Sequence, residues 1–218
     1  MVRENLARIR ERISKAAEKS SRAPDAIKLV VVTKEAGIDE ILQAIEEGVR
    51  DIGENRLKDA LAKKESLDSH VLTWHMIGHL QSNKAKEAVK LFSVIHSVDS
   101  AKLAEILNKE ARKNGKVQDI FIEVNVSGEK SKFGVQPKGI EAFLKEAETF
   151  RNLKIRGLMT MAPFTDNAET TRPVFKKLKE LADANGLKEL SMGMSQDFEV
   201  AIEEGSTMVR IGRAIFKQ

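Results

Sequence analysis

The chain has 218 residues, of which 41% are hydrophobic and 32% charged, so it can bury one sizeable core and we expect a single domain over residues 1–218. Cysteine is absent, which excludes disulfide frameworks, thiolate nucleophiles and Cys-ligated metal centres and fits a cytoplasmic location. The net charge of +4 comes from 37 basic and 33 acidic residues that are interleaved along the chain, and only 5% of residues are aromatic, so we expect no nucleic-acid partner.

The first predicted element is an amphipathic helix at the start of the chain. Apolar residues recur there at helical spacing among charged ones: Leu6, Ile9, Ile13 and Ala16. The pattern ends near Ser20, and Pro24 follows shortly afterwards. This helix therefore precedes the main fold.

From there the sequence alternates between short apolar runs and longer charged stretches. The apolar runs predict strands at residues 27–33, 49–52, 75–77, 94–98, 120–126, 155–161, 190–194 and 208–211. Helical patterns closed by Gly or Asn-Gly lie between them, for example at residues 38–47, 101–113 and 174–184. Each apolar run is far shorter than the roughly 20 residues of a membrane-spanning helix, so we expect no membrane partner.

This order of elements favours an α/β fold. Roughly eight strand-then-helix units on a chain of this length predict a (β/α)8 TIM barrel with a preceding N-terminal helix. A doubly wound open sheet is the alternative, because parallel strands are buried on both faces in either fold. In a barrel the functional side chains gather at the carboxyl ends of the strands, so the polar residue that follows each apolar run is a candidate.

Lys34 directly follows the first strand run and is the first candidate. A lysine at the mouth of a barrel is poorly solvated, and desolvation lowers the pKa of an amine, which leaves a fraction of it neutral and able to attack a carbonyl group. The alternative is a lysine that extends from the strand end into solvent.

Asn55 follows the second strand run, and two histidines follow from the third. His75 and His79 are four residues apart, a spacing that can mark a metal site on a helix. Gly78 lies between them and argues against a helix, and the nearby sequence holds no carboxylate, so we expect no metal site. A role for His75 in packing and hydrogen bonding is favoured instead.

The last two strand runs carry the most informative polar residues. The loops after the seventh and eighth strands of a barrel form its usual phosphate-binding site. Ser195 supplies a hydroxyl there, Gly212 lets the backbone approach an anion, and Arg213 begins the terminal helix. Arg210 lies within the last strand, where an unpaired charge is costly, so we expect an acidic or acceptor partner for it. Together with the amine of Lys34, a phosphate site suits a phosphorylated aldehyde such as pyridoxal phosphate.

A series of motifs covers nearly the whole chain. In order they are Val-Thr-Lys at 32–34, Gly-Glu-Asn-Arg at 53–56, Trp-His-Met-Ile-Gly-His-Leu-Gln-Ser-Asn-Lys at 74–84, His-Ser-Val-Asp at 96–99, Glu-Val-Asn at 123–125, Ser-Met-Gly-Met-Ser at 191–195, and Gly-Ser-Thr-Met-Val-Arg-Ile-Gly-Arg-Ala-Ile-Phe at 205–216. This series resembles the pyridoxal-phosphate homeostasis proteins of the YggS/PROSC type, whose fold is similar to the barrel domain of alanine racemase.

The resemblance implies a binding site for pyridoxal 5′-phosphate. Seven residues of this chain correspond to it: Lys34, Asn55, His75, Ser195, Arg210, Gly212 and Arg213. In this site Lys34 forms the Schiff base, Ser195 and the backbone of residues 212–213 hold the phosphate, and Arg210 faces the pyridine nitrogen. The other two residues line the site in supporting roles. The chain departs from the family at residues 35–37, Glu-Ala-Gly in place of a Lys-Pro continuation, and at residue 213, where a small residue is commoner.

The implied function is to hold pyridoxal phosphate, to take part in its intracellular homeostasis and to supply it to apoenzymes. The alternative is an amino-acid racemase-like enzyme of low activity. Racemisation by two bases needs a second base opposite the lysine, and in the racemase relatives this is a tyrosine from an additional domain. The sequence has no tyrosine. An arginine at the pyridine nitrogen also leaves that nitrogen unprotonated, which weakens the ring as an electron sink.

A third hypothesis is a module that binds nucleic acid or a protein partner through its basic surface. Its candidate residues are Lys84, Lys86, Lys130 and Lys132.

Because there is no room for the additional racemase domain, we expect a monomer.

Overall fold

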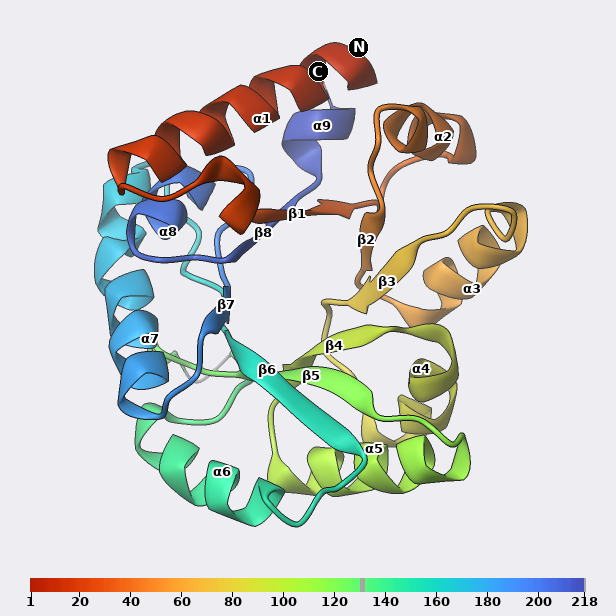
Figure 1. Ribbon diagram of the computed structural model, residues 1–218, viewed down its shortest axis with the longest axis vertical. Helices are drawn as coiled ribbons and strands as arrows, with labels where there is room; N and C mark the ends of the chain where they lie inside the picture. Colours follow the sequence, from red (N-terminus) through yellow and green to blue (C-terminus); the bar gives the residue numbers. More distant parts are fainter. Residues whose placement is uncertain (130–131, 218) are drawn as a thin grey trace.

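The computed structural model describes residues 1–129 and 132–217 (Figure 1). Within this part of the chain, eight strands form a closed barrel in which each strand pairs with the next and β8 pairs in parallel with β1. The strands are β1 Lys28–Val32, β2 Asp51–Glu54, β3 Thr73–Met76, β4 Val94–Val98, β5 Gln118–Glu123, β6 Leu153–Met159, β7 Glu189–Ser191 and β8 Met208–Ile211. The predicted TIM barrel is confirmed, and the open-sheet alternative is wrong.

Helices surround the barrel on the outside (Figure 1). They are α1 Val2–Lys19, α2 Ile38–Glu46, α3 Leu57–Ser66, α4 Ala85–Leu91, α5 Ala101–Lys113, α6 Ile140–Ala147, α7 Arg172–Ala184, α8 Phe198–Glu203 and α9 Arg213–Phe216. The predicted ranges of α2, α5 and α7 agree with the structure to within two residues, and the predicted N-terminal helix is also confirmed.

The apolar strand residues fill two layers, because successive side chains of a strand point to opposite faces. One set packs beneath the helices and forms the large core of the molecule. A smaller cluster forms separately and consists of Val30, Val94, Phe121, Met159 and Met208. Polar side chains on the same strands are buried as well, including those of the two histidines in β3 and β4. The barrel interior is therefore only partly apolar.

Helix α1 packs against α8 and α9, and so connects the two ends of the chain. Leu6 on its inner face is fully buried. The Asn5 side chain donates a hydrogen bond to the carbonyl oxygen of Ile215 in α9 (2.9 Å). On the outer edge, Arg12 pairs with Glu199 of α8 at 2.6 Å. Because α9 directly follows the end of β8, α1 supports the part of the barrel where the predicted phosphate loop lies.

Several strand boundaries differ from the predicted ones by two or three residues. Strand β2 continues to Glu54, since Glu54 pairs with Met76 of β3. Strand β7 ends at Ser191, three residues earlier than predicted. The backbone turns away shortly afterwards at Gly193, whose φ is +93°, in the left-handed region that glycine tolerates best.

Candidate functional site

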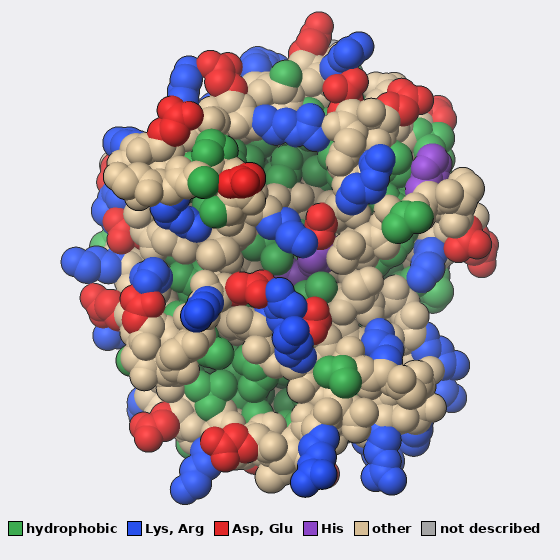
Figure 2. Space-filling view, in the orientation of Figure 1, with side chains coloured by type: hydrophobic (Ala, Val, Ile, Leu, Met, Phe, Trp, Pro, Cys, Tyr) green, Lys and Arg blue, Asp and Glu red, His purple; other side chains and the backbone are tan. Residues whose placement is uncertain are grey.

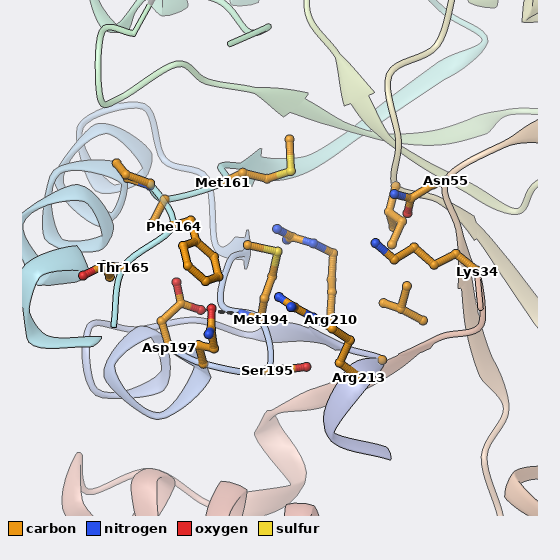
Figure 3. A pocket seen from close by; sticks show the side chains of 16 residues that line it. Lys34, Asn55, Met161, Phe164, Thr165, Met194, Ser195, Asp197, Arg210 and Arg213 are labelled. Carbon is orange, nitrogen blue, oxygen red and sulfur yellow. Dashed lines mark hydrogen bonds between the residues drawn. The ribbon is translucent and has the colours of Figure 1, made fainter. Parts of the chain in front are cut away.

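A cavity of about 180 Å³ opens at the carboxyl ends of the barrel strands. Its walls come from segments at or beyond the ends of β1, β2, β3, β6, β7 and β8, so residues that are distant in sequence meet there (Figure 3). Six of the seven residues predicted from the sequence line it: Lys34, Asn55, Ser195, Arg210, Gly212 and Arg213. The structure places the seventh, His75, outside this lining.

Lys34 follows β1 and points into the cavity beside Asn55, as Figure 3 shows. Its side chain is 42% exposed, and its Nζ lies 3.9 Å from a carboxylate oxygen of Glu35. The sequence predicts a poorly solvated lysine, and this expectation is wrong, because the segment after β1 forms an open rim and not an enclosed floor. An amine in this place is accessible both to a ligand in the cavity and to molecules from solvent.

Asn55 is held in place by a close approach of two loops. A Cβ atom on Gly78 would lie 2.3 Å from the carbonyl oxygen of Asn55, so only glycine lets the loop after β3 pass at this distance. This contact explains the glycine between His75 and His79 better than a metal site does. Among the described residues, no group of three or more His, Cys, Asp or Glu side chains could hold a metal ion.

The predicted phosphate site lies where the ends of β1 and β8 meet. A Cβ atom on Gly212 would lie 2.7 Å from the carbonyl oxygen of Val32, so this position requires glycine. The hydroxyl of Ser195 accepts a hydrogen bond from the backbone N–H of Ala214 at 3.4 Å. In the described part of the chain, the backbone N–H groups of Gly212 and Arg213 have no protein acceptor. Unpaired donors beside a hydroxyl suit an anionic ligand such as a phosphate.

Arg210 of β8 is buried, with 3% of its surface exposed, and it lines the cavity. Its Nη1 donates to the hydroxyl of Ser191 (2.6 Å) and its Nη2 donates to the carbonyl oxygen of Thr160 (3.0 Å). The predicted acceptor partners are therefore confirmed. Burial lowers the pKa of Arg210 to about 10, while the nearby carboxylates of Asp197 and Glu123 oppose that shift. The guanidinium is still protonated at neutral pH and has further N–H donors for a ligand.

Two buried carboxyl groups near Arg210 were not among the predicted site residues. Asp197 lines the cavity and accepts a hydrogen bond from the backbone N–H of Met194 (2.6 Å), and burial raises its pKa. Glu123 at the end of β5 has its pKa raised to about 7 by burial and by the nearby carboxylate of Asp99. Glu123 is the one charged residue within the apolar run at residues 120–126, and this is the sequence signal that could have identified it.

The cavity wall formed by residues 161–165, after β6, was also missed. Met161 is 36% exposed and Phe164 is 72% exposed, and both line the cavity, as does Met194 on the loop after β7. In Figure 3, Phe164 lies on the side of the cavity opposite Lys34. Apolar side chains at such a rim can cover a flat ring, but no sequence pattern distinguishes them from core residues.

His75 lies in the barrel interior, where only 1% of its surface is exposed. Its Nε2 is 2.8 Å from Asp51 Oδ1, and its Nδ1 is 2.9 Å from Nε2 of His96. Asp51 is the first residue of β2, so its partner histidine is directed toward the amino-terminal end of the barrel and away from the cavity. This is the physical reason why the ring is absent from the cavity lining.

The structure describes three of the four basic candidates of the third hypothesis. Lys84 and Lys86 are exposed on the segment that contains α4. Lys132 pairs with Glu129 at 2.7 Å. Lys130 lies outside the described residues. In the part of the chain that the structure describes, no helix is long and apolar enough to cross a membrane.

Residues 5–218 match the family described as the alanine racemase N-terminal domain. The pyridoxal phosphate homeostasis protein of Aquifex aeolicus is 44% identical over 98% of this chain and 96% of its own length. That of Pseudomonas aeruginosa is 40% identical over 99% of this chain and 94% of its own.

Two kinds of solved structure are similar to this one. PipY of Synechococcus elongatus with PLP bound is 36% identical and superposes with a TM-score of 0.85 over 99% of this chain and all of its own. Alanine racemase of Clostridium difficile is 16% identical, with a TM-score of 0.75 over the whole of this chain and 56% of its own. The racemase shares the fold alone.

Proposed function

The chain belongs to the family of pyridoxal phosphate homeostasis proteins within the alanine racemase N-terminal domain fold, and we propose that it binds pyridoxal 5′-phosphate (PLP) in the cavity at the carboxyl ends of the strands. It holds PLP as a Schiff base on Lys34, takes part in intracellular PLP homeostasis and supplies the cofactor to apoenzymes. The similar PipY structure has PLP bound, and this supports PLP as the ligand of the present chain.

The observation that carries the proposal is that three chemically different groups line one cavity. PLP has an aldehyde, a phosphate and a pyridine nitrogen. The cavity offers an amine in Lys34, a hydroxyl and unpaired N–H groups around Ser195 and Gly212, and a guanidinium in Arg210. Each group of the ligand therefore has a complementary partner, and these partners come from the ends of β1, β7 and β8.

When bound, the cofactor supplies an aldehyde that reacts reversibly with amines. Nζ of Lys34 would form a carbon–nitrogen double bond to the aldehyde carbon, and the carbonyl oxygen would leave as water together with the two hydrogens of the amine. For release, an amine of an acceptor protein would replace Lys34 at the same carbon, and its two hydrogens would pass to Nζ of Lys34, which leaves as a free amine. The 42% exposure of the Lys34 side chain allows such an amine to approach.

Arg210 makes catalysis at the α-carbon of an amino acid slow. A protonated guanidinium facing the pyridine nitrogen prevents that nitrogen from binding a proton, so the ring withdraws electrons weakly. The sequence also has no tyrosine that could act as a second base. These features support a carrier over a racemase.

We also propose that the chain works as a monomer in the cytoplasm.

Absorption spectroscopy tests the role of Lys34. We expect the wild-type protein titrated with PLP to give a visible absorption band that Lys34→Ala does not give. The matched control is Lys84→Ala, which removes an exposed lysine that does not line the cavity. An unchanged band in Lys34→Ala would contradict the proposal, as would its loss in the control.

A further inference from the structure

A chain of hydrogen-bonded side chains crosses the interior of the barrel and ends at Arg210. Arg210 Nη1 is 2.6 Å from Ser191 Oγ, which is 2.8 Å from His96 Nδ1. His96 Nε2 is 2.9 Å from His75 Nδ1, and His75 Nε2 is 2.8 Å from Asp51 Oδ1. Ser191 and both histidines are buried, with at most 1% of their surfaces exposed. The chain therefore joins the cavity to the opposite end of the barrel.

Every link in this chain has a defined donor. Arg210 can only donate, so Ser191 Oγ accepts from it and directs its own hydrogen to His96 Nδ1. The proton of a neutral His96 is then on Nε2 and points to His75 Nδ1. In turn, the proton of a neutral His75 is on Nε2 and points to the carboxylate of Asp51. The two ends of the chain thus determine both histidine tautomers.

The charged groups around the chain favour neutral rings. Burial lowers the pKa of His75, and it lowers that of His96 well below its usual value. Near His96 the positive charge of Arg210 acts in the same direction, and Lys28 does so for both rings. Among the described residues, Asp51 opposes the lowering of the His75 pKa. Asp51 is itself paired with Lys28 at 3.2 Å, at the amino-terminal end of the barrel.

The other groups that face the chain do not interrupt it. The ring of His96 stacks on Phe121 with centroids 4.7 Å apart, and the two histidine rings meet edge to face at 5.1 Å. Glu123 and Asp197 act on Arg210 at the cavity end. Figure 2 shows a histidine at the centre of the molecular face on view, surrounded by basic and acidic side chains.

We propose that Asp51, His75, His96 and Ser191 are positioning residues that hold Arg210 as a fixed donor and couple its electrostatic effect on a bound ligand to the far end of the barrel. Hydrogen bonds that point the same way polarise one another, so the charge of Asp51 strengthens each link up to Arg210. This inference rests on the proposed function for one point only, namely that Arg210 faces the pyridine nitrogen of PLP.

The first test needs no ligand. In ¹⁵N NMR spectra of the histidine side chains of the protein without PLP, we expect His75 and His96 to be neutral at pH 7, with the proton on Nε2. His70 and His79 lie outside the chain and serve as internal references. A proton on Nδ1 of either ring, or a charged ring, at neutral pH would show that the chain does not run in this direction.

The second test is a double-mutant cycle on the PLP-loaded protein. Asp51→Asn removes the terminal charge, and Ser191→Ala cuts the chain without changing any charge. We expect Asp51→Asn to lower the pH midpoint of the visible band by about 0.5 pH unit, because loss of a negative charge disfavours the protonated linkage. In the Ser191→Ala background the same substitution should shift the midpoint by less than half as much.

Asp119→Asn is the matched control, because Asp119 lies near the start of β5, at the same end of the barrel, and pairs with Arg156 and not with a histidine. It should leave the midpoint unchanged. If the wild-type protein shows no visible band, the proposed function fails while the NMR test still decides the direction of the chain. If the band is present but Asp51→Asn has no effect, or the same effect without Ser191, the inference fails alone.

Discussion

At the residue scale, the proposed phosphate site depends on one glycine. The ends of β1 and β8 approach so closely at Gly212 that any side chain there would collide with the backbone of Val32. The N–H groups next to it lose their geometry if either strand end moves. Position 212 is therefore the most direct place to test how the phosphate is held.

We expect Gly212→Ala to weaken PLP binding by about 10- to 100-fold, which corresponds to the loss of one charge-assisted hydrogen bond. Titrations with PLP and with pyridoxal, which lacks the phosphate, measure this effect. The loss should be larger for PLP. The control is Gly37→Ala, at a position with φ −75° whose added Cβ would meet its nearest neighbour at 3.8 Å. An equal loss for both ligands would contradict the assignment of the phosphate site.

Glu123 gives the protein a pH-dependent stability. Its pKa is raised to about 7 in the folded protein, whereas a glutamate in an unfolded chain titrates near pH 4.3. The folded state thus binds the proton more tightly, and the stability that this proton contributes is lost as the pH rises through about 7.

Between pH 5 and pH 8, we expect the free energy of unfolding of the wild type to fall relative to that of Glu123→Gln, by on the order of 3 kcal/mol. Urea denaturation at several pH values measures the difference. The exposed residue Glu141 provides the comparison, and Glu141→Gln should show no such trend. A constant difference between Glu123→Gln and the wild type would show that Glu123 does not titrate in this range.

The sequence predicts the cavity-lining residues better than the residues beneath them. Lys34, Ser195 and Arg210 each lie at or near the end of an apolar run. The carboxyl ends of the strands meet at one end of a barrel, and this is sufficient to bring such positions together. The position of His75 could not be predicted in this way. Whether a residue inside a strand contacts the cavity or the opposite end of the barrel depends on its depth, and in this case on a carboxylate that a different strand contributes.

At the scale of elements, α1 stabilises the barrel from outside. Leu6 is fully buried beneath it, and we expect Leu6→Ala to lower the free energy of unfolding by about 2–5 kcal/mol. Chemical denaturation measures this value, with Lys15→Ala on the exposed face as the control, where the change should stay within about 0.5 kcal/mol. If both variants are equally stable, α1 does not pack on the barrel as described.

Helices were easier to predict than strand ends. Helix α5 matches its predicted range because Asn114-Gly115 ends an uninterrupted amphipathic pattern. Strand β7 was predicted to reach residue 194, since the Met residues after Ser191 continue the apolar run. The strand ends where pairing stops and the backbone turns at Gly193, and neither event leaves a mark in the hydrophobic pattern.

At the scale of the whole molecule, the closure of the barrel gives its two ends different roles. Its carboxyl end presents an accessible amine and donors for an anion, and the hydrogen-bonded chain through the interior connects that end with Asp51. An open sheet would leave these side chains on separate edges. The closure of β8 on β1 brings Gly212 next to Val32, and so places the loop that we propose binds the phosphate beside Lys34.

The central claim is that one nitrogen atom, Nζ of Lys34, carries the cofactor. Borohydride treatment of the PLP-loaded protein converts the carbon–nitrogen double bond into a stable single bond, and mass spectrometry of the peptides then locates it. We predict that the peptide containing Lys34 carries the added mass of the reduced cofactor in nearly all molecules. Labelling spread over surface lysines, or confined to another lysine, would contradict the account.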